Sequence, residues 1–317
     1  MVLLLQYTLI FAAVLLLVAL GGCFSEHSGV INIGLEGIMV IGALGGALVM
    51  RFLPYEGGSL GADIGMFAAV FAASVLAGMI YSLLLAVACI NFKADQTIVG
   101  TAMNLLGTAL ATVIVKSMNT AANPNDHSSE IQYFGQKKAF LSTFGRFELN
   151  WFMVVAAVLL VVSIILLYKT RFGLRLRACG EHPQAADSVG INVYKMRYAG
   201  VLISGALGGL GGITYITAGV SSWKFENGVA GFGFLALAVM IFGAWDPARI
   251  ALAALLFGFF RALGNTYVGF DFLKALNIPS PVYNMLPYIV SLIVLAFTSK
   301  NSRAPKAEGI PYDKGQR

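Results

Sequence analysis

Residues 3–22 read LLLQYTLIFAAVLLLVALGG, a stretch with no acidic or basic side chain. A helix needs about 20 mainly apolar residues to cross a bilayer core about 30 Å thick. Backbone groups in hydrocarbon must be hydrogen-bonded within the protein, which leaves helices or closed barrels, and this run is too long and too uniformly apolar for a barrel strand. The stretch therefore predicts a transmembrane helix.

The rest of the sequence shares this character. Hydrophobic residues make up 58% of it and charged residues 11%, and its mean hydropathy of +0.80 lies outside the range of soluble globular proteins. We predict an all-α fold, a polytopic integral membrane helical bundle of about nine transmembrane helices. The further candidate spans are residues 30–50, 65–90, 97–115, 150–168, 198–220, 229–245, 250–270 and 282–298.

Basic residues gather in two segments that flank predicted spans. Six of the 21 Lys and Arg residues lie within residues 169–197, and five lie in the tail, residues 299–317. By the positive-inside rule both segments are expected in the cytoplasm, so orientation, and not a nucleic-acid partner, explains the net charge of +6. Residues 1–298 then form the membrane domain, with the N-terminus outside, residues 116–149 as the largest external loop, and a tail that is expected to be disordered.

The run Asn32-Ile33-Gly34-Leu35-Glu36-Gly37 is the most informative part of the membrane region. A carboxylate in a span is costly against lipid, so Glu36 is expected to face the bundle interior, a wet cavity or the interface. Gly34 and Gly37 allow close backbone approach. Two interpretations stay open: Glu36 lines or braces a substrate path, or it only interacts with the helix dipole near the membrane surface.

Two other predicted spans also carry polar side chains. Residues 95–104 read DQTIVGTAMN, and Asp95 or Thr97 is suited to cap the helix that follows. Asn104 lies two turns into that helix, where its amide needs a polar solute or, alternatively, a partner on a neighbouring helix. Arg261 lies in the middle of another span, where it either serves a polar path or snorkels to an interface.

A polar segment with helix signals follows the span at residues 150–168. Residues 174–191 read LRLRACGEHPQAADSVGI, which predicts a short helix at residues 184–189 with Gly190 suited to end it. A short amphiphilic helix held against the membrane by two spans is typical of a docking surface for a cytoplasmic partner. It is equally consistent with an ordinary capped loop.

The run Gln184-Ala185-Ala186-x-x-x-Gly190 resembles the Glu-Ala-Ala-x-x-x-Gly loop of ATP-binding-cassette (ABC) importer permeases, with Gln184 in place of the glutamate. The surrounding residues 180–192 and the glycine-rich run at 204–212 are similar to the branch that serves branched-chain amino acids, simple sugars and nucleosides. The segments 32–37 and 95–104 resemble the nucleoside members in particular. Residues 231–247 resemble the downstream helix of the family.

The resemblance implies a permease subunit of the cell (inner) membrane that forms half of a translocation pathway among the membrane lipids. Its implied partners are a cytoplasmic ABC ATPase, a second permease that completes a heterodimer, and an extracytoplasmic solute-binding lipoprotein. The implied substrate-path residues are Asn32, Gly34, Glu36, Gly37, Gln96 and Asn104. Within the cytoplasmic coupling loop, residues 169–197, the implied ATPase contacts are Gly180, Glu181, Pro183, Gln184, Ala185, Ala186 and Gly190.

A nucleoside importer is the leading hypothesis, and a simple-sugar importer or an ATP-independent carrier or channel are the alternatives. The sequence has no Gly-x-x-x-x-Gly-Lys-Ser/Thr phosphate loop, so we expect a partner to hydrolyse ATP. It shows no carboxylate pair, histidine cluster or nucleophile arrangement, so we expect neither an enzyme nor a cofactor or metal site.

Overall fold

The computed structural model describes residues 2–55, 59–131, 139–144, 147–220, 223–271, 279–298 and 304–315. Helices make up most of this part of the chain. They are α1 (Val2–His27), α2 (Leu35–Phe52), α3 (Leu60–Ala86), α4 (Gln96–Ala122), α5 (Trp151–Lys169), α6 (Arg171–Glu181), α7 (Pro183–Ser188), α8 (Val193–Thr214), α9 (Phe232–Phe242), α10 (Pro247–Thr266) and α12 (Ser280–Thr298). Short π-helical turns continue α3 to Asn91 and α8 to Gly219.

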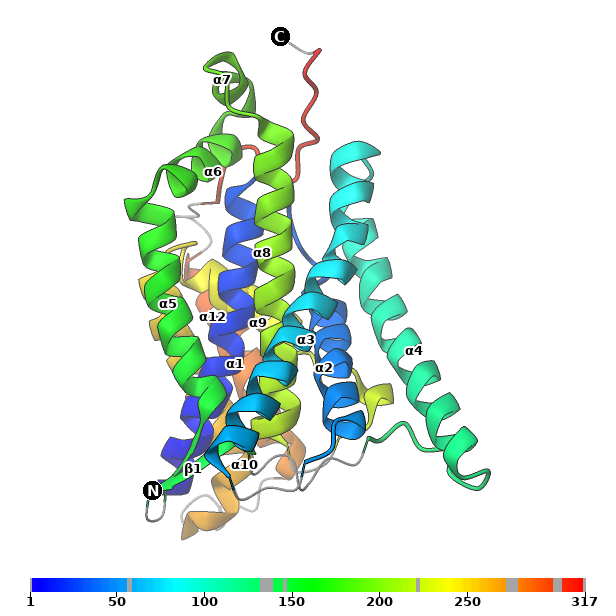
Figure 1. Ribbon diagram of the computed structural model, residues 1–317. Helices are drawn as coiled ribbons and strands as arrows, with labels where there is room; N and C mark the ends of the chain where they lie inside the picture. The colour runs from blue at the N-terminus through cyan, green and yellow to red at the C-terminus, as the bar shows by residue number, and fades with distance from the viewer. Residues whose placement is uncertain are drawn as a thin grey trace.

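Eight of the described segments are long and apolar enough to cross a membrane, although one of them, Phe225–Phe242, reaches that length only with the 3-10 turn and the residues that precede α9. In addition, α12 occupies the position of the ninth predicted span. The long helices run side by side between the two ends of a bundle (Figure 1). The N-terminus lies at one end, and α6, α7 and the C-terminus lie at the other. The predicted all-α membrane bundle is confirmed.

One element between α4 and α5 was not predicted. The strands β1 (Leu141–Phe144) and β2 (Phe147–Asn150) pair antiparallel directly before α5. The side chain of Asn150 then accepts the backbone N–H of Phe152 and caps α5. In addition, α4 continues to Ala122, about two turns beyond the predicted span 97–115.

Glycines bring three helices into close contact at the centre of the bundle. A Cβ atom on Gly42 of α2 would lie 2.2 Å from the Cα atom of Gly209 in α8. One on Gly78 of α3 would lie 2.2 Å from the carbonyl oxygen of Gly205 in α8. Close backbone approach through small residues is typical of helix packing in membranes, where lipid offers no competing hydrophobic drive.

The predicted span at 30–50 is wrong at its start. α1 ends at His27 and α2 begins only at Leu35, so residues 28–34, named here the α1–α2 junction, are not helical. Gly29 turns the chain with φ +90°, a conformation that favours glycine. Irregular backbone at membrane depth must be covered by protein, and Ser28, Val30 and Asn32 are fully buried.

The predicted span at 229–245 is also interrupted. Its helix, α9, has only 11 residues, so it is about 16 Å long and covers roughly half of a bilayer core. The left-handed conformation of Gly231, at φ +78°, marks the start of the helix, and Gly243 ends it. The two interrupted segments meet inside the bundle.

The described tail, residues 304–315, is packed against the bundle and is not disordered as predicted. Ala307 is 6% exposed and Tyr312 is 4% exposed. This part of the chain is named the tail segment. The rest of the predicted tail, residues 299–303 and 316–317, lies outside the described residues.

Candidate functional site

Glu36 lies in the first turn of α2 and is almost fully buried. Its carboxylate accepts the backbone N–H of Gly231 at 2.8 Å and that of Gly233 at 2.7 Å. The N–H of Val229 points to the same carboxylate at 3.4 Å. The first N–H groups of a helix lack intrahelical acceptors and form the positive end of its dipole. Glu36 therefore caps α9, inside the bundle, rather than its own helix at the membrane surface.

The capping geometry requires a glycine on the α9 side. A Cβ atom on Gly233 would lie 2.5 Å from the backbone nitrogen of Glu36 and 2.9 Å from its Oε2 atom. Because no side chain fits there, the carboxylate reaches the helix start directly. The contact ties the beginning of α2 to the beginning of α9.

Asn104 of α4 bridges the chain on both sides of the start of α2. Its Oδ1 atom accepts the N–H of Gly37 at 2.8 Å, and its Nδ2 atom donates to the carbonyl of Ile33 at 2.9 Å. A Cβ atom on Gly37 would lie 2.5 Å from the carbonyl oxygen of Met103, so α2 and α4 touch through backbone. Both polar atoms of the Asn104 amide thus have protein partners. This agrees with the interpretation that Asn104 joins neighbouring helices.

Gln96 and Asn32 complete this cluster. Gln96 Oε1 accepts the N–H of Ile31 at 2.6 Å, and Asn32 Nδ2 donates to Ser204 Oγ at 2.8 Å. Asp95, and not Thr97, caps α4 through its side chain. The predicted path residues are therefore close together around the α1–α2 junction, where hydrogen bonds to the protein hold their polar groups.

The predicted coupling residues lie at the end of the bundle that carries α6 and α7 (Figure 1). The short helix predicted at 184–189 is α7, with Pro183 at its first turn. Pro183 and Ala186 are buried, whereas Gln184 and Ala185 are exposed. Gly190 adopts φ +83° after the helix, as its predicted role in ending the helix requires.

Gly180 at the end of α6 touches the end of α1. A Cβ atom on Gly180 would lie 2.4 Å from the carbonyl oxygen of His27. The neighbouring Cys179 is fully buried, and burial raises the pKa of its thiol to about 11, so the thiol is a neutral packing group. The predicted coupling segment and the α1–α2 junction therefore adjoin each other.

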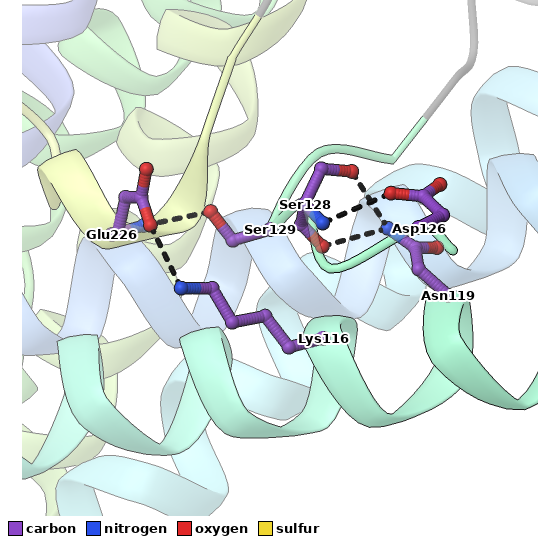
Figure 2. A network of polar contacts seen from close by, with 6 residues as sticks. All are labelled: Lys116, Asn119, Asp126, Ser128, Ser129 and Glu226. Carbon is purple, nitrogen blue, oxygen red and sulfur yellow. Dashed lines mark hydrogen bonds and ion pairs between the residues drawn. The ribbon is translucent and has the colours of Figure 1, made fainter. Parts of the chain in front are cut away.

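A polar cluster occupies the opposite end of the bundle (Figure 2). Lys116 of α4 pairs with Glu226, which precedes α9, at 3.0 Å, and Asn119 donates to the backbone of Ser128 and Glu130. The hydrogen bonds from Ser128 lower the pKa of Asp126 and keep it charged. A cavity of about 290 Å³ adjoins this cluster, lined by Arg51, Asn119, Ala122, Asn123, Asp126, Ser128 and Glu130.

Sequence analysis missed several buried polar residues. Trp245 Nε1 donates to the carboxylate of Glu26 at 2.5 Å, and both side chains are buried. Arg197, counted above among the basic residues that set orientation, is only 1% exposed. Arg261, for which the sequence left a polar path or an interface open, is partly buried, and its guanidinium lies over the rings of Phe11 and Phe232, at 5.8 and 5.5 Å, so it faces the bundle interior. In the sequence, the only sign that Glu26 is special was its charge directly beside a predicted span.

Comparison with known proteins gives consistent matches over nearly the whole chain. It is 41% identical to the guanosine ABC transporter permease protein NupQ of Bacillus subtilis, covering 98% of this chain and 96% of the relative. It is 39% identical to the nucleoside ABC transporter permease protein NupC of Lactococcus lactis, with coverages of 97% and 96%. It is 30% identical to the putative glucose ABC transporter permease protein TsgC13 of Haloferax volcanii, with coverages of 93% and 91%.

A bundle of membrane-spanning helices with two interrupted spans, together with these relatives, defines the class of transporter permeases. The chain belongs to the family described as the branched-chain amino acid transport system / permease component, whose model matches residues 4–296. The resemblance inferred from short motifs is thereby confirmed.

Proposed function

We propose that the chain is one permease subunit of an ABC importer for nucleosides and forms half of its translocation pathway. The observation that carries the substrate class is the match, over nearly the whole chain, to two relatives named for guanosine and nucleoside transport. The relative named for glucose is less similar, at 30% identity, so a simple-sugar importer is the second candidate.

The exposed side of α7 supports docking to a cytoplasmic ATPase. Val189, directly after the helix, is 76% exposed, and the exposed Gln184 and Ala185 accompany it. Pro183 and Ala186 fix the other side of the helix to the bundle, so that a force on α7 reaches the membrane helices. In the contact with the ATPase, Gln184 takes the place of the family's glutamate and brings no charge. In this arrangement α7 and the tail segment are cytoplasmic and the N-terminus is outside.

The surface chemistry of α4 and α5 supports a pathway shared with a second, different permease. The exposed residues of α5 include a row of aliphatic side chains suited to lipid: Val154, Val158, Val161, Val162 and Ile165. The exposed surface of α4 is mixed: beside aliphatic side chains such as Leu105 and Val113 it exposes Thr97 and Thr101 and partly exposes Thr108 and Lys116, and a charge against lipid is costly. We infer that this side of α4 faces the pathway and that Asn32, Gly34, Glu36, Gly37, Gln96 and Asn104 brace it.

The polar cluster around Asn119 supports docking of an extracytoplasmic solute-binding lipoprotein. It lies at the end opposite α7 and presents both charged and amide side chains beside the cavity described above. Arg51 and Asn119 hydrogen-bond at 2.6 Å, which holds the ends of α2 and α4 together there.

The test of the proposed function is uptake of labelled guanosine by cells that carry the chain with its ATPase, second permease and binding protein, with ribose as the comparison. We expect ATP-dependent guanosine uptake that unlabelled nucleosides inhibit. Uptake of ribose without guanosine would favour the sugar importer. Uptake that persists without the ATPase would contradict the ABC mechanism.

The coupling role is tested by Val189→Asp. This residue is exposed outside the spans, so the variant should reach the membrane at the normal level but should lose co-purification of the ATPase and uptake together. Val268→Asp is the matched control, because Val268 is the same residue type, is also exposed, at 59%, and does not line the cavity assigned to the binding protein. Equal effects of the two variants would contradict the role of α7.

A further inference from the structure

The tail segment is fixed at both of its ends. Near its start, the N–H of Ala307 donates to the carbonyl of Gly180, in α6, at 2.8 Å. Near its end, Asp313 pairs with Lys93 in the α3–α4 turn at 2.9 Å, and the hydrogen bond from Lys93 lowers the pKa of Asp313 and keeps it charged. The tail segment therefore runs between two elements that are separate in the sequence.

Tyr312, beside Asp313 in the tail segment, supports α7. Tyr312 is 4% exposed, and its ring meets that of Tyr194 edge-on at 5.4 Å. It belongs to one buried cluster with Cys179, Ala186 and Val193. Because Ala186 is on the buried side of α7, the tail segment and α7 share a core.

The tail segment also covers the α1–α2 junction. Gly309 adopts φ +75°, and a Cβ atom there would lie 2.9 Å from the Cδ1 atom of Ile31. The carbonyl oxygen of Ala307 lies 3.4 Å from where a Cβ atom on Gly29 would be. One continuous stretch of chain thus reaches from α7 to the junction that carries Asn32.

Buried polar groups that lack protein partners in the described part of the chain lie in the junction, on Asn32, and beside it, on Gln96 of α4 and Arg197 of α8. These are Asn32 Oδ1, Gln96 Nε2, and Nε and Nη2 of Arg197, whose guanidinium lies 5.9 Å from the Tyr312 ring. The junction, α4 and α8 therefore bring polar side chains together where the tail segment packs on them.

We propose that the tail segment is a coupling strap, a positioning element that transmits displacement of α7 to the α1–α2 junction. The proposal rests on the proposed function, in which an ATPase moves α7. Displacement of α7 acts on Tyr312 through their shared core. The backbone hydrogen bond between Ala307 and Gly180 holds the segment beside α6, and the Lys93–Asp313 ion pair guides its far end, so the movement passes to Ile31 and from there to Glu36 and α9. Tyr312 and Asp313 act through the junction and touch no solute.

The test uses the complete transporter in proteoliposomes with Tyr312→Ala and Tyr312→Phe. The alanine variant should retain the ATPase and its ATP hydrolysis but transport about tenfold less guanosine per ATP hydrolysed, within the range typical of coupling between distant sites. Phenylalanine keeps the ring contacts and should transport normally. Lys314→Ala, on the exposed side of the tail segment, is the matched control and should also transport normally.

A second pair of variants addresses folding. Asp313→Lys places two cations together and should reduce transport per ATP, and adding Lys93→Asp should restore it by reversing the pair. If Tyr312→Ala lowers ATP hydrolysis, transport and thermal stability in parallel, or if it changes none of them, the coupling strap is refuted. Wild-type protein that transports no nucleoside would instead refute the proposed function.

Discussion

The carboxylate of Glu36 accepts the backbone N–H of Gly233 at 2.7 Å, although 197 residues separate the two in the sequence. This bond joins the two interrupted spans. Replacing Glu36 by Ala should destabilise the protein strongly, because each buried N–H that loses its acceptor costs about 1–3 kcal/mol. Glutamine keeps one acceptor oxygen and should have an intermediate effect. The measurement is the thermal unfolding temperature in detergent, with guanosine uptake alongside it.

Glu226→Gln is the control for Glu36→Ala. It also removes a carboxylate, but both side chains of the Lys116–Glu226 pair are 43% exposed. An exposed pair contributes little, about 0–1 kcal/mol. If Glu226→Gln lost as much stability as Glu36→Ala, the stabilising role assigned to the Glu36 cap of α9 would be contradicted.

Gly37→Ala should destabilise the packing of α2 on α4. The added methyl group would lie 2.5 Å from the carbonyl oxygen of Met103, which is backbone and cannot move aside without shifting the helix. Overpacking of this kind costs about 1–3 kcal/mol. Gly61→Ala is the matched control, since its added methyl group would meet no atom within 4 Å. Unfolding temperatures of the two variants that agree would contradict the close contact.

Asn104 distinguishes a brace from a solute-binding residue. Asn104→Asp keeps the acceptor for the N–H of Gly37 but loses the donor to Ile33, so a brace predicts lower stability with unchanged preference among nucleosides. Competition between guanosine and other nucleosides in uptake measures that preference. A changed preference at normal stability would show instead that the amide contacts solute.

Binding of the tail segment should weaken as pH rises. Burial raises the pKa of Glu308, and its hydrogen bond with Glu26 acts in the opposite direction. A carboxyl group whose pKa is raised in the packed state stabilises that state fully below its ordinary pKa. This stabilisation is lost as the pH rises through the raised pKa. The protection of the tail-segment amides, that is, their exchange rate corrected for the intrinsic increase of amide exchange with pH, should therefore fall over this pH range. In Glu308→Gln this fall in protection should be smaller, and an unchanged fall would contradict the assignment.

Much of the membrane bundle was predictable from the sequence because the lipid bilayer restricts which structures can cross it. An uncharged stretch of about 20 residues has few alternatives in hydrocarbon. The end of α1 and the start of α2 were less predictable, since residues 28–34 combine three apolar residues with Ser28, Gly29, Asn32 and Gly34 and give no single signal for where a helix ends. Whether such a stretch continues a helix depends on protein contacts such as the Asn32–Ser204 hydrogen bond, which the local sequence does not contain.

The short motifs identified the residues but not what those residues contact. Glu36 was recognised as a costly charge that must be satisfied, yet its partner, the start of α9, lies in a distant part of the chain. Arg197 was interpreted as a surface charge from its neighbours, whereas folding buries it beside Tyr312. Tail residues 304–315 carry little hydrophobic pattern, so their packing depends on a surface that other helices build.

The sequence by itself determined the membrane bundle, the position of α7 and the family, because hydropathy and short motifs are local properties of the chain. Only the tertiary structure decided that Glu36 caps α9, that the α1–α2 junction is not helical, and that the tail segment joins α7 to it. These are contacts between distant residues, and their free energy depends on which backbone N–H groups and buried charges the fold leaves to be satisfied.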